Sequence, residues 1–368
     1  MKKKLKDLLD YEQPTKYIVE TENYSDEYKL PVLTAGKSFV LGYTNETEGV
    51  FRGKNEPVII FDDFTRDTKY VDFDFKVKSS AMKILHKHNK DDSLKYLHYA
   101  LNNIKYVPFS HKRLWISDFS NMEIDYPSPE IQNTIATELD TIQSAIDNKK
   151  QQLALLDEVV KSRFIEMFGE GRCKQILFSE YAEIIDDDRG KNYPKSEDFS
   201  DNDYCLFLSA KNVTKNGFMF ETNQFISKEK DEILKKGKLN RGDIVITTRG
   251  TIGNIAYYDN SVPYENIRIN SGMVIIRNKD LEFNQHFFLE AFRNKIDDII
   301  ATQVTGAAQP QLPIHIMSKI ILPYPDIKLQ NSFAAFVQQI DKSKFVVKQQ
   351  IKDLQELMDS KMQEYFGE

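Results

Sequence analysis

The sequence has few cysteines, no long apolar run and no excess of positive charge. Cys173 and Cys205 are its only cysteines, and neither has a His or Cys neighbour at the spacing of metal ligands. We therefore expect free thiols in a reducing compartment. No run reaches the roughly 18–20 apolar residues that a membrane span needs. The basic start Met1–Asp7 lacks the apolar stretch of a signal peptide, so we expect a cytoplasmic protein with no membrane partner.

The formal net charge is −6, with 50 Lys and Arg against 56 Asp and Glu. This balance excludes a uniformly basic surface. A nucleic-acid-binding face would have to arise from basic side chains gathered on one side of the fold. Hydrophobic residues make up 40% and aromatic residues 12% of the chain. These fractions indicate packed cores rather than disorder.

Catalytic motifs are also missing. Ala35–Ser38 resembles the end of a phosphate-binding loop, but Pro31 stands where the first glycine is required. Phe168–Glu170 could be mistaken for a methyl-donor loop, yet the same three residues recur at Phe366–Glu368, which is typical of a helix end. We find no Asn/Asp-Pro-Pro-Tyr/Phe tetrapeptide and no nucleophile with a matching base. The sequence predicts a non-catalytic chain that holds no metal and no cofactor.

The most informative feature that is present is a repeat. Residues 123–170 recur at 321–368 without a gap, at a constant offset of 198, and about a third of the positions are identical. Both copies contain Tyr-Pro, Gln-Asn and Lys-Gln-Gln, and both end in Phe-Gly-Glu. A repeat of this length fixes the architecture. It predicts two copies of one unit, each a variable body followed by the same long helix.

The repeated segments predict two helices of roughly 38 residues, about 57 Å long. Apolar residues recur at alternating spacings of four and three, which is typical of a coiled coil. We expect these residues to form the contact between the two helices, paired antiparallel. An alternative is that each helix packs only on its own body. The seam residues are Ile135, Leu139, Ile142, Ile146, Leu153, Leu156 and Val160 in the first helix, and Phe333, Val337, Ile340, Val347, Ile351, Leu354 and Met358 in the second.

Each body is expected to mix helices and strands. In the second body the pattern predicts strands at 242–248, 270–276 and 316–322 and a helix at 283–300. The first body has matching segments at 57–64, 79–85 and 94–103. The predicted fold class is α+β: two mixed α/β target-recognition domains, related by an internal pseudo-two-fold repeat and separated by two long antiparallel coiled-coil helices. The expected domains are 1–128 (recognition domain 1), 129–170 (spacer helix 1), 171–326 (recognition domain 2) and 327–368 (spacer helix 2).

These motifs resemble a known family. The repeat, together with the phrases Asp188–Pro194, Gly242–Gly253, Asn270–Gly272 and Thr305–Pro310, is similar to the specificity subunit of type I restriction–modification systems. The resemblance spans essentially the whole chain. The first body departs from it, because it lacks the Arg-Gly turn found at Arg249 and instead resembles another class of recognition domain in the same family.

The resemblance implies a function and a set of partners. The family's subunit binds double-stranded DNA, each recognition domain reads one half of a bipartite asymmetric target, and the helix pair sets the spacing. Its two helices, through the seam residues named above, also dock two modification subunits, which methylate adenine with S-adenosylmethionine. Restriction subunits, driven by ATP and using Mg, join that complex. Adenine must be flipped out of the stack to be methylated, which requires a pocket in the partner.

Candidate DNA contacts lie in loops, where Arg and Lys can bind guanine or phosphate and Asn and Gln can read adenine. We select Lys37, Thr65, Arg66, Lys69, Lys112 and Arg113 in the first body, and Arg189, Lys191, Asn192, Arg249, Thr251, Asn270 and Gln309 in the second. The acidic clusters Asp62–Asp63 and Asp186–Asp188 are expected to be solvated or to face DNA. Three alternatives stay open: a self-sufficient methyltransferase or nuclease, a specificity chain for a fused nuclease–methyltransferase, and a DNA-free coiled-coil scaffold.

Overall fold

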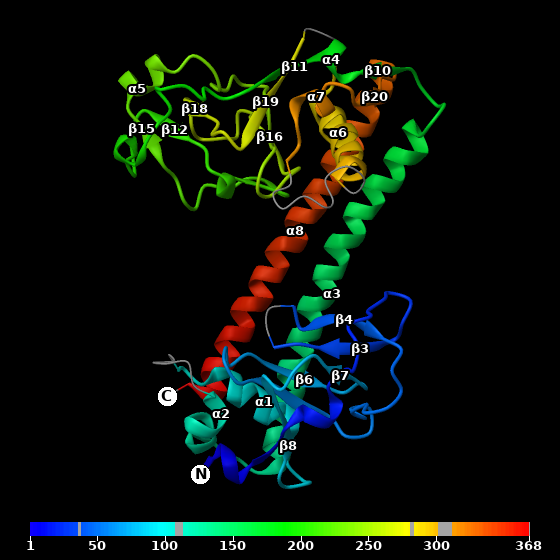
Figure 1. The fold of residues 1–368 in the computed structure, drawn as a ribbon, viewed down its shortest axis with the longest axis vertical. Helices are drawn as coiled ribbons and strands as arrows, with labels where there is room; N and C mark the ends of the chain where they lie inside the picture. The colour runs from blue at the N-terminus through cyan, green and yellow to red at the C-terminus, as the bar shows by residue number, and fades with distance from the viewer. Residues whose placement is uncertain (36–37, 107–112, 280–282, 301–310, 368) are drawn as a thin grey trace. The chain divides into compact units, whose positions relative to one another are not determined.

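The structure, a computed structural model, describes residues 1–35, 38–106, 113–279, 283–300 and 311–367 (Figure 1). The chain divides into two compact units. The first unit is Met1–Gln151 with Val347–Glu368, and the second is Gln152–Val346. Each unit contains one mixed α/β body and part of both long helices, α3 (Pro129–Phe168) and α8 (Ile327–Phe366), which have 40 residues each. The predicted pair of long helices is confirmed.

A four-stranded sheet forms the centre of the first body. All its neighbouring strands are antiparallel. The central strand β5 is buried on both faces: Ile59 and Phe61 contact the helix-side core, whereas Val58 and Ile60 contact a second core on the opposite face. The strand order is β2 (Leu9–Glu12), β8 (Met82–Lys87), β5 (Val58–Asp62) and β6 (Thr68–Val71).

Shorter elements complete the first body. A three-stranded sheet combines an antiparallel and a parallel pair, and a two-stranded sheet joins the N-terminus to the segment before α3. The elements are β4 (Val40–Thr44), β3 (Leu30–Leu33), β7 (Lys76–Val77), β1 (Lys2–Lys4), β9 (Glu123–Asp125), α1 (Leu94–Asn103), α2 (Leu114–Ser117) and the 3₁₀ helices Leu5–Asp7, Pro14–Tyr17 and Phe119–Asn121.

The second body repeats the topology of the first. Its four-stranded sheet has the order β11 (Ala182–Ile185), β19 (Met273–Asn278), β16 (Ile244–Thr247) and β17 (Ile255–Tyr257). Its three-stranded sheet again joins one antiparallel and one parallel pair. The remaining elements are β15 (Phe225–Ile226), β12 (Cys205–Phe207), β18 (Ile267–Arg268), β10 (Gln175–Leu177), β20 (Ile321–Pro323), β13 (Val213–Thr214), β14 (Gly217–Phe218), α4 (Phe178–Tyr181), α5 (Lys228–Ile233), α6 (Gln285–Ile299), α7 (Ile314–Met317) and the 3₁₀ helices Ser196–Asp198 and Ala210–Asn212.

One predicted strand differs from the structure. The segment 316–322 was expected to be a strand throughout, but Ile316 and Met317 belong to α7, and β20 begins only at Ile321. The amides of Ile316 and Met317 donate to the carbonyl oxygen of Pro313, at 3.0 and 3.2 Å. Proline is compatible with the start of a helix, because its fixed φ is helical and its missing N–H is not needed there.

The sequence repeat extends to single hydrogen bonds where each long helix begins. Gln132 and Gln330 are both buried. The side-chain oxygen of Gln132 accepts from the Ser93 amide at 3.0 Å. Its side-chain nitrogen donates to the main-chain carbonyl of Pro127 at 3.1 Å. Gln330 does the same with the Asn284 amide at 3.0 Å and Pro325 at 2.9 Å. Each glutamine therefore ties the start of its long helix to the start of a helix in the body.

Replacing Gln330 by alanine should lower the free energy of unfolding by about 1–3 kcal/mol, because the half-buried Asn284 amide and the buried Pro325 carbonyl lose their partners. The neighbouring Asn331 is a matched control, since its bond to Asn284 is exposed. Asn331→Ala should change stability by less than about 0.5 kcal/mol. Denaturant titration of the two variants checks this, and equal losses would contradict the assigned role of Gln330.

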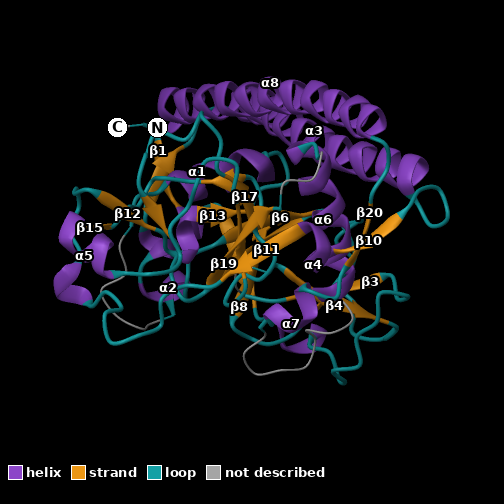
Figure 2. Ribbon diagram, turned by 90° about the horizontal axis from the view of Figure 1, so that it is seen from above, coloured by secondary structure: helices purple, strands orange, loops and turns teal. Residues whose placement is uncertain are grey.

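Within each unit, the long helices contact each other and the body. In the second unit, Lys344 pairs with Asp157 at 2.6 Å, and the rings of Phe333 and Phe168 lie 5.4 Å apart. Residue numbers rise along one helix as they fall along the other, so the helices run antiparallel there. In the first unit, Lys361 pairs with Glu138 at 3.0 Å. The long helices are plainly distinguished from the strand-rich bodies in Figure 2.

The predicted seam residues have mixed environments. Ile135 and Leu139 belong to the core of the first body, with Met358 packed against it, whereas Phe333, Val337 and Val160 pack with Phe287 of the second. The expected pairing of the helices is confirmed, and the alternative that each helix packs only on its own body is wrong, because α8 also packs on the first body and α3 on the second. Buried seam residues are Ile142, Ile146 and Val347, and half-buried ones are Leu153, Leu156, Ile340, Ile351 and Leu354. None of the described helices is long and apolar enough to cross a membrane.

Candidate nucleic-acid interface

The topology of the four-stranded sheet brings several candidate residues of the second body to one edge. Strands β11 and β16 both pair antiparallel with β19. The segments that follow β11 and β16 therefore meet the segment that precedes β19. Arg189 follows β11, Arg249 follows β16, and Asn270 precedes β19. We call these three segments, residues 186–193, 248–254 and 269–272, the second loop edge.

Hydrogen bonds join these segments. The amides of Thr248 and Arg249 both donate to the carbonyl oxygen of Gly272, at 2.7 and 3.3 Å. The side-chain oxygen of Asn270 accepts from the Gly272 amide at 2.9 Å, and the Tyr193 hydroxyl accepts from the Ser271 amide at 3.2 Å. Three of the phrases that the sequence singled out separately, Asp188–Pro194, Gly242–Gly253 and Asn270–Gly272, are thus joined into one cluster, with the half-buried Tyr193 packed on Phe207. The fourth, Thr305–Pro310, lies outside the described residues.

Arg249 and Arg189 differ in their availability for a ligand. Arg189 donates to Asp187 at 2.7 Å and to Asp186 at 2.9 Å. The hydrogen bond with Asp187 raises the pKa of Arg189. Arg249 is exposed, and no carboxylate in the described part of the chain pairs with its guanidinium. Arg249 is therefore free to bind a partner, whereas Arg189 is held by its own loop.

The other candidates of the second body are also at this edge. Lys191 and Thr251 are exposed and Asn192 is half-buried. Their side chains form no hydrogen bond with any other residue that the structure describes. The Thr251 carbonyl oxygen accepts from the buried Thr247 hydroxyl, which fixes the loop while leaving the Thr251 side chain outside. Gln309 lies outside the described residues.

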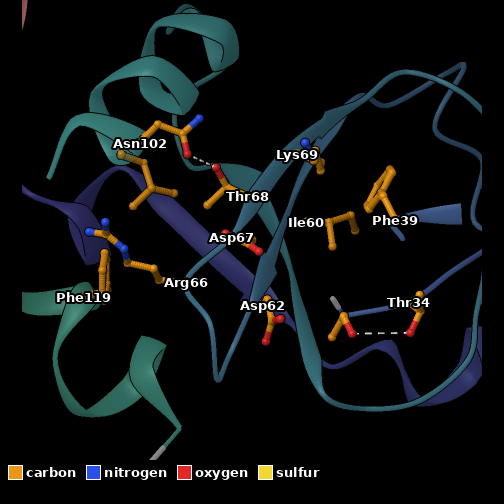
Figure 3. A pocket seen from close by; sticks show the side chains of 12 residues that line it. Thr34, Phe39, Ile60, Asp62, Arg66, Asp67, Thr68, Lys69, Asn102 and Phe119 are labelled. Carbon is orange, nitrogen blue, oxygen red and sulfur yellow. Dashed lines mark hydrogen bonds between the residues drawn. The ribbon is translucent and has the colours of Figure 1, made fainter. Parts of the chain in front are cut away.

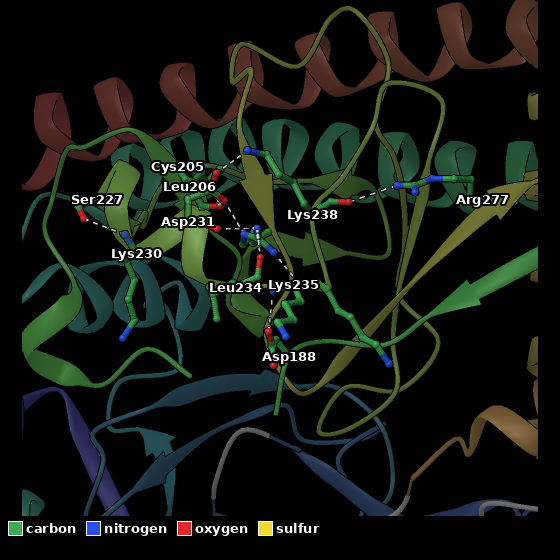
Figure 4. A network of polar contacts seen from close by, with 12 residues as sticks. Asp188, Cys205, Leu206, Ser227, Lys230, Asp231, Leu234, Lys235, Lys238 and Arg277 are labelled. Carbon is green, nitrogen blue, oxygen red and sulfur yellow. Dashed lines mark hydrogen bonds and ion pairs between the residues drawn. The ribbon is translucent and has the colours of Figure 1, made fainter. Parts of the chain in front are cut away.

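A buried charge network in the second body is centred on Asp231 (Figure 4). The carboxylate of Asp231 accepts hydrogen bonds from Lys238 and from the buried Arg268. Burial alone would raise the pKa of Asp231, but these bonds outweigh it and hold the pKa below its usual value. Arg268 also donates to the carbonyls of Asp231 and Leu234, both at 2.8 Å. The network pins the segment that carries Gly237, whose carbonyl accepts from the Ile269 amide at 2.9 Å.

The corresponding edge of the first body, which we call the first loop edge, is built around the turn 62–68 between β5 and β6. The Asp62 carboxylate accepts from the amides of Phe64 and Thr65, at 2.8 and 3.2 Å, and from the Thr65 hydroxyl at 2.5 Å. The Arg66 guanidinium donates to the carbonyl oxygen of Ile104, the C-cap residue of α1, at 2.8 Å. Thr65 and Arg66 thus hold the turn together while remaining exposed.

The two turns close in the same way. The Arg66 amide donates to the Asp62 carbonyl oxygen and the Gly253 amide to the Thr247 carbonyl oxygen, both at 3.0 Å. Both residues are left-handed, with φ of 65° at Arg66 and 85° at Gly253. Such a φ favours glycine and costs about 1–2 kcal/mol for other residues. In the first body an arginine occupies the strained position.

Lys69 and Arg113 are also exposed near the first loop edge. Lys69 lies on β6, and Arg113 precedes α2, where its carbonyl oxygen accepts from the Ser117 hydroxyl at 2.9 Å. A cavity of about 410 Å³ opens beside the turn, lined in part by Asp62, Arg66 and Lys69 (Figure 3). Lys37 and Lys112 lie outside the described residues. The first loop edge therefore presents exposed cations around a hydrogen-bonded turn.

The acidic clusters are not solvated as expected. Asp63 is buried and pairs with the buried Lys83 at 3.2 Å, while its second carboxylate oxygen accepts from the Trp115 amide at 2.9 Å. Asp62 is buried beneath its turn, and Asp187 beneath Arg189. The loops need these carboxylates as internal acceptors for their own N–H groups and cations. Sequence spacing missed this, because Lys83 and Trp115 are distant from Asp63 along the chain.

No group of three or more His, Cys, Asp and Glu residues in the described part of the chain is arranged to hold a metal ion. Cys173 and Cys205 are free thiols. Burial raises the pKa of Cys205 to about 12, so the thiol is neutral near pH 7. The geometry assembles exposed Arg, Lys and Thr side chains and half-buried Asn side chains at sheet edges. Such side chains bind phosphates and base edges.

Comparison with known proteins points in the same direction. The family model described as "Type I restriction modification DNA specificity domain" matches residues 1–158 and 178–356. The chain is 45% identical over 160 residues to the specificity subunit of the type I restriction enzyme EcoR124I/EcoR124II of Escherichia coli, across 43% of this chain and 35% of that protein. It is 25% identical over 271 residues to the MjaIX specificity subunit of Methanocaldococcus jannaschii, across 68% and 62%. The chain spans less than two thirds of either relative.

Solved structures share the fold. The S subunit of the type I restriction–modification system of M. genitalium superposes with a TM-score of 0.55 at 17% identity, over 100% of this chain and 96% of that one. A chain from a structure of the type I R-M system has a TM-score of 0.56 at 12% identity, over 99% and 97%. The family model covers both bodies and most of the sequence, and the protein therefore belongs to the family of type I restriction–modification DNA specificity proteins.

Proposed function

We propose that this chain is the DNA-binding specificity subunit of a type I restriction–modification complex. The first body contacts one half of a bipartite asymmetric target and the second body contacts the other half. The helix pair sets the distance between them. The chain itself is not catalytic, and its partner subunits use S-adenosylmethionine, ATP and Mg.

The observation that supports this most is the pair of loop edges. The four-stranded sheets of the two bodies have the same strand order, and each sheet has polar loops at the equivalent end. The second loop edge carries Arg249, which pairs with no carboxylate among the described residues, together with the hydrogen-bonded Asn270. This combination is suited to guanine and adenine edges. The first loop edge carries different side chains. A shared scaffold with different contact residues is what two unlike half-sites require.

The long helices are the proposed docking surface for two adenine-methyltransferase subunits. In the second unit they expose large apolar side chains: Leu155 is 58%, Phe345 72% and Val346 54% exposed. Exposed apolar side chains on a helix are typical of interaction surfaces. Adenine must leave the stack to be methylated, so the pocket that receives it belongs to the docked subunit.

Arg249→Ala should weaken binding to a cognate duplex by about tenfold or more, because a bidentate arginine–guanine contact is lost. Binding to random duplexes should change little. Titration of the full chain with both duplexes, at two salt concentrations, measures this. Affinity for every duplex should fall as salt rises, since phosphate contacts release counterions.

Lys191→Ala is the matched control, because Lys191 is an exposed cation at the same edge. A lysine that contacts phosphate contributes equally to all sequences, so its loss should weaken cognate and random duplexes alike. Equal weakening by Arg249→Ala would reduce Arg249 to a phosphate contact. If the unaltered chain binds no duplex at low salt, the DNA-free scaffold replaces the proposed function.

A further inference from the structure

The internal repeat identifies which residues of the two loop edges occupy the same place. In the first body Asp62 pairs with Met82 across the sheet, and in the second Thr247 pairs with Met273. The next residues also correspond: the Asp63 carbonyl oxygen accepts from the Leu114 amide at 2.9 Å, and the Thr248 carbonyl oxygen accepts from the Leu312 amide at 3.0 Å. The position that follows is Phe64 in the first body and Arg249 in the second.

Phe64 lies in a hydrogen-bonded turn and exposes its side chain. Its side chain is 49% exposed. Its amide donates to the Asp62 carboxylate at 2.8 Å. The preceding residue, Asp63, is fixed by two contacts. Its amide donates a hydrogen bond to the Ala81 carbonyl oxygen at 3.2 Å, and its carboxylate pairs with Lys83. The exposed ring is therefore presented by a backbone fixed on both sides.

The chemistry around Phe64 favours a nucleic-acid contact over a protein contact. Arg66, Lys69 and Arg113 are exposed cations on the same edge. Another exposed apolar residue there, Ile116, is 50% exposed, and Ile314, its counterpart 198 residues later, is 36% exposed. This position is therefore an isoleucine in both bodies. Phe64 and Arg249 differ, so this position can distinguish one half-site from the other.

We infer that Phe64 reads a thymine in the half-site bound by the first body, at the place where Arg249 reads a guanine for the second. This inference rests on the proposed function. On the base edges of an intact duplex, the apolar projection is the C5-methyl group of thymine, which phenylalanine can contact. Inserting the ring between base pairs would instead require unstacking, which costs additional energy. Phe64 is then a specificity-determining residue, and the cations around it contact the phosphate backbone of the DNA.

The test begins with the motif that the unaltered full chain selects from random duplexes. Each thymine of that motif is then replaced by deoxyuridine, which removes only the methyl group. We expect one replacement, in a single half-site, to weaken binding by about four- to tenfold. Phe64→Ala should bind the thymine and deoxyuridine duplexes equally. Phe64→Leu, which keeps an apolar side chain, should retain part of the discrimination.

Two variants serve as controls. Ile131→Ala removes a side chain of similar exposure, 51%, from α3 and should leave every preference unchanged. Arg249→Ala should alter the other half-site only, which also shows that Phe64→Ala acts locally. Retained discrimination by Phe64→Ala, a half-site without a sensitive thymine, or equal weakening of all duplexes would each overturn the inference. If the unaltered chain selects no motif, the proposed function fails first.

Discussion

Replacing Asp63 by alanine should lower the free energy of unfolding by about 3–5 kcal/mol, because it leaves a buried cation without its partner. Lys83 and Asp63 are both buried, and their charged groups lie 3.2 Å apart. The substitution also removes the acceptor of the Trp115 amide. Denaturant unfolding of the full chain measures the loss. A loss below about 1 kcal/mol would show that water or another residue replaces the carboxylate.

The second body supplies the matched control for this pair. At the equivalent positions it has Thr248 and Val274, and Pro313, which has no amide hydrogen, stands where the first body has Trp115. The double variant Asp63→Thr with Lys83→Val should therefore recover part of the stability that Asp63→Thr alone loses. It should not recover all of it, because the Trp115 amide still needs an acceptor. Equal losses in the single and the double variant would contradict the ion-pair account.

Replacing Phe168 by alanine should lower the free energy of unfolding by about 3–5 kcal/mol, since a large buried ring leaves a cavity. Phe168 packs edge-on against Phe287 of α6 at 4.8 Å and against Phe333 of α8 at 5.4 Å. It therefore joins the end of α3 to the second body and to the start of α8. Thermal and denaturant unfolding both report this loss.

Ile165 is the matched control for Phe168. It lies one turn earlier on α3 and is 55% exposed. Ile165→Ala should change stability by less than about 0.5 kcal/mol, as surface substitutions usually do. If Ile165→Ala and Phe168→Ala have similar effects, the end of α3 does not depend on the aromatic cluster, and the packing of helix ends on the bodies would need another basis.

The sequence predicted the parts of the fold that local patterns determine. The repeat at a constant offset and the apolar spacing predicted α3 and α8, and runs such as 242–248 predicted β16. Strands of two or three residues, such as β7 and β18, have too little pattern to be recognised. The parallel pairing of the three-stranded sheets depends on contacts between distant segments, which spacing along the chain does not reveal.

The candidate site was predictable by segment but not by role. The segments around Arg189, Arg249 and Asn270 were identified from sequence, and the structure brings them to one edge. The ion pairs of Arg189 depend on the folded loop and were not foreseen. Phe64 was missed, although its signal was present. It is an apolar residue in a polar turn, and the equivalent position of the other body is an arginine. Comparing the bodies position by position required the strand register.

The most direct test of the proposed function is the methylome of cells that carry this chain with its modification partner. We expect an asymmetric methylated motif made of two different half-sites separated by a spacer of fixed length. Arg249→Ala should relax one half-site and Phe64→Ala the other. A single continuous motif, a motif with two identical halves, or methylation that does not depend on this chain would contradict the account.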